Sequence, residues 1–272
     1  PVMKNELLKS VSHARNIKSR ILFHLSHLLY NYSATKNHYR SNQHAISYTQ
    51  LMEKNKQLIK DEPWQYLSGL NNLAVTYSLT GKFEEASEVV LKMRSFPKKY
   101  AIQILPSIQA EIFCISYNLE LSIIIFLCQF ENIYGTVNTI ERELVINKEF
   151  IDESRKLSLI YKVAYLFFCM GEYKKSMAWI NKVLNSSLEN SRQRIICIAK
   201  VVSLIIHYEL GNWQVLPYAL KSASRFLKKR EALYKTENAI LDFVAKNLAR
   251  DGTDKERLEG FKALRKDLIA IF

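Results

Sequence analysis

Glycine, proline and cysteine are scarce in this chain of 272 residues, and each scarcity excludes a class of protein. There are only 7 Gly and 5 Pro, too few for the many tight turns of an all-β fold. The 4 Cys have no paired spacing and lie in apolar, helical stretches, so we expect buried free thiols in a reducing compartment. This usage predicts a cytoplasmic location. The four are Cys114, Cys128, Cys169 and Cys197.

Long, uniform apolar runs are also missing. The most apolar stretch, Leu119 to Phe130, carries Glu120 and Gln129 and is too short to cross a bilayer. We therefore expect no membrane span and predict a helix buried between two neighbours. The chain begins Pro1-Val2-Met3 without a secretory signal, which suggests that more protein lies upstream.

Signatures of catalysis are lacking as well. The sequence has no nucleophile elbow, phosphate loop, HExxH or CxxC motif. His24 and His27 lie three residues apart on one predicted helix, a spacing that could seat a metal. No third ligand adjoins them, so the favoured interpretation is a helix surface or core contact. We predict a protein that is not an enzyme and uses neither cofactor nor metal.

What the sequence does contain is helical periodicity, most clearly between Leu70 and Met93. Four residues of this stretch recur at steps of three and four, which places them on one helical face. Gly81 then suits the left-handed end of that helix, and Phe83 can fill the gap before a second apolar stripe begins. The four residues of the first face are Leu70, Leu73, Ala74 and Tyr77.

This helix–turn–helix unit resembles a tetratricopeptide repeat. That family has a large residue, then Leu-Ala, then Tyr, then Gly-x-aromatic-x-x-Ala, and the unit fills the final position with Ala86. It departs from the family at Val90 and Met93, where an aromatic and an alanine are usual. The resemblance implies an all-α fold, an α–α superhelix or solenoid of helical pairs.

Looser copies of the unit follow. One places Gly171 and Tyr173 at the corner with Ser176 in the small position, and another has Gly211 and Trp213. A degenerate copy centres on Glu131 and Ile133. Because one helical pair cannot bury its own apolar face, stacked copies are expected. We predict a single repeat domain over residues 1–272, as the C-terminal part of a longer protein.

The C-terminal hundred residues also resemble a family of uncharacterised bacterial helical-repeat proteins. The resemblance lies in the run from Ile205 to Asn212 and in the segments Arg225–Glu231 and Leu233–Tyr234. It supports a helical-repeat fold and implies no activity.

Along the chain, apolar spacing and breaker residues predict the following elements. Helices are expected at Asn5–Ser33, Gln43–Ile59, from Pro63 to Phe96 with the turn at Gly81, Tyr100–Leu127 with a restart near Pro106, Tyr134–Asn147, Glu149–Met170, Glu172–Asn185, Ser191–Leu210, Trp213–Lys229, Glu231–Arg250 and Lys255–Ile271. Pro97 should end the helix before it. Asp251-Gly252 is expected to form the last turn and Asp254 to cap the last helix.

The chain is basic, with a formal charge of +13, which permits acidic partners, nucleic acid or anionic surfaces. Four cations share one predicted helical face and form a candidate anion patch; the alternative is a solvated helix face. They are Lys221, Arg225, Lys228 and Lys229.

First helices line the inner surface of a tetratricopeptide array, and the resemblance places candidate peptide-binding residues there. These are Asn72 in the first unit and Lys162 with Tyr165 in the second. The expected function is therefore a non-enzymatic scaffold that holds a protein or peptide segment. The alternatives are a regulatory or sensor region of a larger DNA-binding protein and direct nucleic-acid binding by basic helix faces. The oligomeric state stays open.

Overall fold

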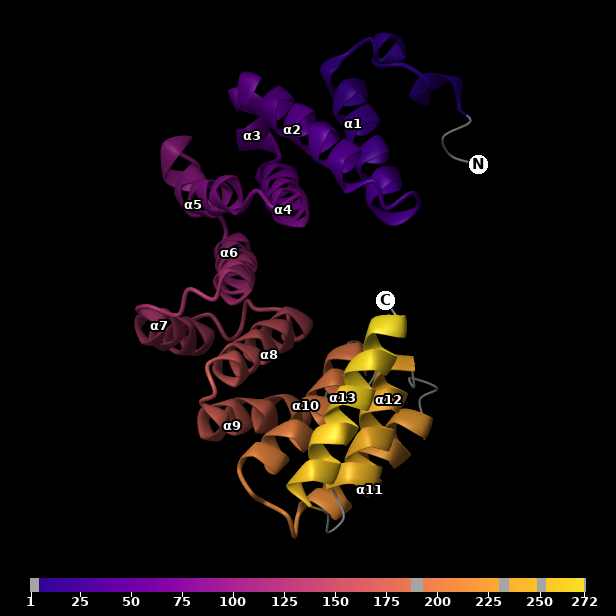
Figure 1. Cartoon of the computed structure of the whole chain (residues 1–272). Coiled ribbons are helices and arrows are strands. Elements are labelled where there is room, and N and C mark those ends of the chain that lie inside the picture. Colours follow the sequence, from indigo (N-terminus) through magenta and orange to yellow (C-terminus); the bar gives the residue numbers. More distant parts are fainter. Residues whose placement is uncertain (1–4, 187–192, 230–234, 249–252, 272) are drawn as a thin grey trace. The chain divides into compact units, whose positions relative to one another are not determined.

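A computed structural model describes residues 5–186, 193–229, 235–248 and 253–271, and these residues form helices joined by turns, with no strand among them (Figure 1). The all-α prediction is confirmed. The chain divides into two compact units, residues 1–151 and 152–272.

The first unit contains seven α-helices preceded by two short 3-10 turns. Their bounds are η2 (Glu6–Leu8), η3 (Val11–His13), α1 (Ile17–Ser33), α2 (His38–Lys54), α3 (Lys56–Asp61), α4 (Pro63–Leu79), α5 (Phe83–Lys99), α6 (Pro106–Leu127) and α7 (Ile133–Ile146).

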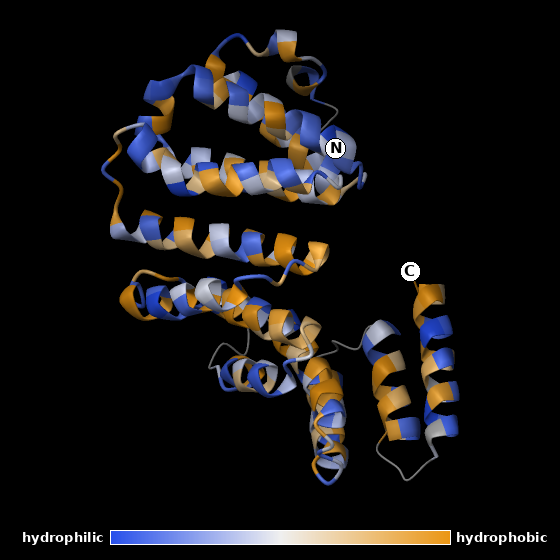
Figure 2. Cartoon of the chain, turned by 60° about the vertical axis from the view of Figure 1, so that its left-hand side comes forward, coloured by the Kyte–Doolittle hydropathy of each residue, from blue (hydrophilic) through white to orange (hydrophobic). Residues whose placement is uncertain are grey.

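The described part of the second unit runs from α8 to α13. Its elements are α8 (Glu153–Cys169), α9 (Tyr173–Leu184), α10 (Gln193–Glu209), α11 (Leu216–Lys229), α12 (Lys235–Phe243), a π-turn η4 (Val244–Leu248) and α13 (Asp254–Ile271). Along α13, apolar and polar residues alternate (Figure 2).

Three corners share one backbone closure. At Gly81 the φ angle is +76°, the Gly81 N–H bonds to the Ser78 carbonyl, and the next N–H bonds to the Tyr77 carbonyl. Gly171 (φ +72°) and Gly211 (φ +68°) repeat the same two bonds with their own preceding helices. This is the Schellman arrangement, which glycine adopts without steric cost. The corners at Gly81, Gly171 and Gly211 join α4 to α5, α8 to α9 and α10 to α11, and in each pair the two helices pack together.

A fourth corner of this kind lies at Cys128, where no glycine marks it. Cys128 has φ +55°, and the N–H groups of Cys128 and Gln129 bond to the carbonyls of Ile125 and Ile124. The sequence pattern predicted this degenerate corner three residues later, at Glu131. Because a left-handed cysteine leaves no signature in the sequence, only the backbone reveals the corner.

The first predicted helix is wrong in its N-terminal half. Residues 5–13 form two 3-10 turns, and α1 begins only at Ile17. Asn16 accepts a hydrogen bond from the Ser19 N–H at 2.9 Å, while the Ser19 hydroxyl accepts one from the Asn16 N–H at 3.1 Å. This reciprocal cap fixes a helix start inside a stretch whose apolar spacing looks continuous.

The second helix also differs from its prediction. α2 begins at His38, about five residues earlier than expected, because Asn37 caps it by accepting the Arg40 N–H at 3.0 Å. It ends at Lys54, and α3 is a separate short helix.

Proline marks two helix starts as predicted, since Pro63 and Pro106 each occupy the first position of a helix. Pro97 does not end α5, which continues to Lys99. Phe96 and Tyr100 are buried on either side of it and meet the fully buried Tyr66 ring edge to face, at 5.3 and 5.9 Å between centroids. This packing holds the final turn despite the lost backbone donor.

The apolar part of α6 extends well beyond Leu119–Phe130, the stretch that was too short to cross a bilayer. By length and composition it is the one helix of the described residues that could cross a membrane, because the apolar residues from Pro106 to Tyr117 extend the stretch that begins at Leu119. In the structure α6 packs on α4 and α5. Its Glu120 bonds to Arg94 of α5 at 2.6 Å, and Arg94 also donates to Ser116. Nine of its residues are buried, as in a core helix.

A single carboxylate ties three helices of the first unit together. Glu53, on α2, accepts hydrogen bonds at Oε1 from the Tyr66 hydroxyl of α4 at 2.8 Å and from the Lys92 ammonium of α5 at 2.9 Å. Asn42 of α2 adds a buried bond to Thr76 of α4 at 3.1 Å. These contacts join α2 to the helical pair α4 and α5, which contains the first repeat-like unit.

At the end of the chain, Thr253 rather than Asp254 precedes the last helix. Thr253 and Glu256 form a capping box: the Glu256 N–H bonds to the Thr253 hydroxyl at 3.3 Å and the Thr253 N–H to the Glu256 carboxylate at 2.8 Å. The predicted turn at Asp251-Gly252 lies outside the described residues.

The four thiols divide into two classes. Cys114 and Cys197 are buried as predicted, whereas Cys128 and Cys169 are exposed. Both exposed cysteines stand at the C-terminal ends of helices, Cys128 at the end of α6 and Cys169 at the end of α8.

Candidate functional site

The second unit carries a row of stacked aromatic rings along α8. Tyr161 and Tyr165 stack at 6.2 Å between centroids, and Tyr165 stacks on Phe168 at 6.1 Å, each pair with an 18° interplanar angle. Phe168 meets Tyr173 of α9 at 5.9 Å. We call Tyr161, Tyr165 and Phe168 the aromatic row.

The aromatic row lies on the half-buried face of α8, opposite the face that is buried in the core. The buried face of α8 consists of Leu157, Leu159, Ile160, Val163, Ala164, Leu166 and Phe167. The aromatic row and Lys162 occupy the remaining face and are half-buried. In the small position of the repeat, Ser176 of α9 is fully buried and donates a hydrogen bond to the Ala164 carbonyl at 2.8 Å. The close approach of α9 therefore fixes the orientation of the row.

Lys162 lies beside the row, one turn from Tyr165. Desolvation lowers the pKa of its ammonium group, and the described part of the structure shows no carboxylate paired with it. Burial also raises the pKa of Tyr165, with a further contribution from Cys169. The arrangement is an apolar, hydroxyl-edged surface beside a partly desolvated cation.

The corresponding surface of the third helical pair, on α10, is covered by other side chains. Val201 and Val202 of α10 are buried, and Tyr208 contacts Trp213 and Phe261 edge to face at 5.2 and 6.1 Å. Because Phe261 belongs to α13, the last helix closes this part of the surface.

Asn72, the remaining predicted peptide-binding residue, is half-buried on α4. It belongs to the first unit, whereas Lys162 and Tyr165 belong to the second. The structure therefore brings Lys162 and Tyr165 together. That Asn72 lies on the same surface as these two residues stays a prediction.

The predicted anion patch is exposed. All four cations lie on the outer side of α11, while Leu216, Ala223 and Leu227 form its buried side. The four cations and the buried apolar residues thus lie on different sides of α11, as on a solvated helix face or an anion-binding surface.

The two histidines of α1 have a third neighbour that the sequence analysis missed. His44 of α2 faces His24 with 3.1 Å between their Nδ1 atoms and stacks on His27 at 4.8 Å. The described residues contain no group of three or more His, Cys, Asp or Glu arranged to hold a metal. No signal in the sequence pairs His24 with a residue twenty positions away, because the register of two packed helices decides it.

No family model, curated protein or solved structure matches this chain.

Proposed function

We propose that this chain is a non-enzymatic binding module whose helical pairs stack as a right-handed superhelix and hold a peptide or protein segment on their first helices. Its support is the shared closure of three corners, which have the same two hydrogen bonds and a glycine at positive φ. Repetition of one pair geometry is how helical solenoids create a long preformed surface.

The observation that carries the proposal is the aromatic row beside Lys162. Stacked tyrosines offer a large contact area with few rotamers to immobilise, which lowers the entropic cost of binding. A desolvated ammonium group without a carboxylate gains most from a partner that supplies one. The segment that fits is therefore one with apolar or aromatic side chains and an acidic group.

A peptide-display selection on the full chain tests this proposal. Selected peptides should be acidic, and Tyr165→Ala should weaken their binding about tenfold, the effect of losing roughly 1.4 kcal/mol at an aromatic contact. Lys162→Met should reduce the preference for acidic peptides. Tyr218→Ala is the matched control, because Tyr218 is 76% exposed on α11 of the same unit.

Two results would count against the proposal: selection that enriches no peptide above background, or equal losses of binding in the Tyr165 and Tyr218 variants. A photoreactive residue at position 165 provides a second readout, since it should crosslink to the selected peptide.

The exposed cations of α11 favour a second candidate function, nucleic-acid binding, either directly or as a regulatory region of a larger DNA-binding protein. Four cations on one face would give binding that weakens steeply as salt rises. Replacing Lys221 and Arg225 with glutamine should then flatten the salt dependence of a gel shift. No shift at low salt would remove this candidate.

A further inference from the structure

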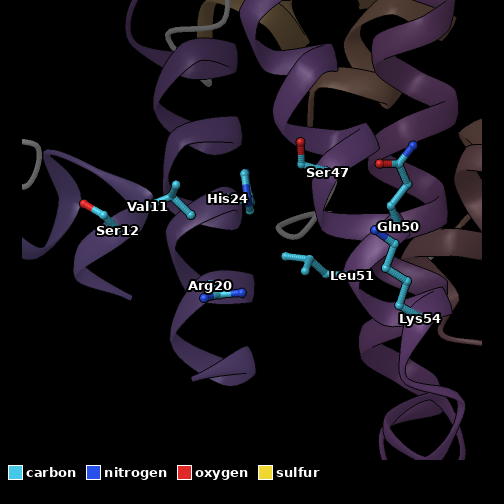
Figure 3. A pocket seen from close by; sticks show the side chains of 8 residues that line it. All are labelled: Val11, Ser12, Arg20, His24, Ser47, Gln50, Leu51 and Lys54. Atoms are coloured by element: carbon cyan, nitrogen blue, oxygen red, sulfur yellow. The ribbon is translucent and has the colours of Figure 1, made fainter. Parts of the chain in front are cut away.

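A cavity of about 310 Å³ lies in the first unit, between the 3-10 turn η3, α1 and α2 (Figure 3). In the close-up, Val11 and Ser12 come from the turn, Arg20 and His24 from α1, and the remaining lining side chains from α2. Those of α2 are Ser47, Gln50, Leu51 and Lys54.

None of the described residues that line the cavity carries a carboxylate. Arg20 and Lys54 carry permanent positive charge, and the Ser12 hydroxyl and Gln50 amide can donate hydrogen bonds. The Ser47 hydroxyl already donates to the Gln43 carbonyl at 3.1 Å. Val11 and Leu51 supply an apolar wall. A cation would be repelled by this set, whereas an oxyanion would find charge and donors together.

We propose that this cavity binds a small oxyanion-bearing ligand, a phosphate or phosphate monoester, with Arg20, Lys54 and His24 around the anionic group. The two apolar residues would contact the carbon part of a monoester. The proposal is independent of peptide binding, because it concerns the other unit and other residues.

The histidine cluster couples this site to pH. A protonated His24 can donate its Nδ1–H to the His44 Nδ1, 3.1 Å away, and still keep its Nε2–H for a ligand. A neutral His24 can accept from the His44 Nδ1–H and offer its Nε2–H, but it brings no positive charge to an anionic ligand. Burial and the neighbouring His27 lower the pKa of His24, so the free site favours the neutral form. An anion in the cavity reverses this balance, and binding should strengthen as pH falls.

The other charged groups around the cluster act in the same direction. Burial lowers the pKa of His44 most, followed by His27 and His24, and Arg40 of α2 adds a smaller effect in the same direction. On the N-terminal segment, Glu6 is paired with Lys9. That carboxylate is therefore already neutralised and does not substitute for a ligand.

The N-terminal segment is anchored to the cluster by backbone contacts. His27 Nε2 lies 2.8 Å from the Leu8 carbonyl, and His13 Nδ1 lies 2.8 Å from the Glu6 carbonyl. Arg20 donates from Nε to the Ala14 carbonyl at 3.2 Å, which leaves its terminal nitrogens for a ligand. The wall formed by Val11 and Ser12 is thus held in place.

Calorimetry and proton NMR of the full chain test the site with sulfate, inorganic phosphate and glycerol 3-phosphate. Sulfate keeps its charge between pH 5.5 and 7.5, so a stronger interaction at pH 5.5 reports on the protein. Tighter binding of the ester than of free phosphate would identify a monoester as the ligand class, and the reverse order would identify phosphate itself. The His24 ring resonance should titrate at a higher pH when sulfate is present.

Two variants separate the roles of charge and protonation. Lys54→Gln should weaken sulfate binding about tenfold at both pH values, the cost of one charge-assisted hydrogen bond. His24→Gln should retain weak binding but lose its pH dependence. Lys148→Gln is the matched control, since Lys148 is exposed in the same unit and does not line the cavity.

The proposal is overturned if 10 mM sulfate shifts no histidine resonance at about pH 5.5, or if the Lys54 and Lys148 variants bind sulfate equally well. Arg20→Lys tests whether the positive charge at this position is sufficient for binding. Lysine keeps the charge but does not reproduce the hydrogen bond from Arg20 Nε to the Ala14 carbonyl. An Arg20→Lys variant that folds, as judged by circular dichroism, and retains binding supports the site.

Discussion

Replacing Cys128 with glycine should stabilise the first unit. Cys128 occupies the left-handed region at the end of α6, with φ +55° and ψ +33°. A residue with a Cβ pays about 1–2 kcal/mol for this conformation. Glycine avoids that cost but loses about 0.5–1 kcal/mol more chain entropy on folding. The exposed thiol makes one weak contact, 3.8 Å from the Ile125 carbonyl, so little else is lost.

The difference is a gain of about 0.5–1 kcal/mol in the free energy of unfolding. For a unit of this size, that gain raises the melting temperature by roughly 1–4 °C. Urea denaturation followed by circular dichroism measures the first quantity, and differential scanning calorimetry measures the second. Gly171→Ala probes the same closure in reverse and should destabilise the second unit by a similar amount, because Gly171 has φ +72° and open space around its α-carbon.

Two controls separate backbone strain from thiol chemistry. Cys128→Ala keeps the left-handed Cβ and removes the sulfur, so its stability should stay within about 0.5 kcal/mol of the parent chain. Cys169→Gly makes the same replacement at the last residue of α8, where helical φ and ψ favour a side chain, and should destabilise the second unit by about 0.5–1 kcal/mol. If Cys128→Gly lowered stability as Cys169→Gly does, the shared-corner interpretation would be refuted.

Two further predictions concern packing and pH. Gly69→Ala should destabilise the first unit by about 1–3 kcal/mol in urea denaturation, because an added Cβ would lie 2.3 Å from a ring carbon of Tyr48. Gly135→Ala has open space in α7 and should be neutral or stabilising by up to about 1 kcal/mol. Equal effects of the two substitutions would contradict the packing of Gly69 against Tyr48. Burial, His27, His24 and Arg40 lower the pKa of His44 to about 4 in the folded chain. The His44 side chain of the unfolded chain therefore binds a proton at a higher pH, so the free energy of unfolding should fall as pH drops from about 6.5 towards 4. Urea midpoints at pH 7 and 5 should differ less in His44→Gln than in the parent chain, and an unchanged difference would assign the acid sensitivity elsewhere.

Much of the helical framework could be predicted because local chemistry decides it. Gly81, Gly171 and Gly211 each mark a left-handed closure, and Pro63 and Pro106 each open a helix. These residues restrict the backbone by their own covalent structure, so no tertiary context is needed.

The errors occurred where packing or a short-range cap overrode the apolar pattern. Asn16 starts α1 in the middle of a continuous stripe, and Phe96 with Tyr100 carries α5 past Pro97. Cys128 closes a corner with a residue type that rarely adopts the left-handed region. Each needed knowledge of contacts or backbone angles that spacing does not supply.

The candidate sites divide in the same way. The proximity of Lys162 and Tyr165 could be predicted because both lie on one helix, where spacing fixes which side chains are neighbours, whereas their binding of a peptide stays a prediction. The histidine cluster and the oxyanion cavity could not be predicted, since they combine α1 and α2 with the N-terminal turn. A site that spans several elements depends on how those elements pack.

The bridging carboxylate Glu53 has a consequence for how the first unit opens. Because one oxygen holds side chains from both α4 and α5, neither helix can detach from α2 without stranding a partly buried charge or hydroxyl group. Backbone amides in these three helices should therefore exchange with deuterium together, as one cooperative block.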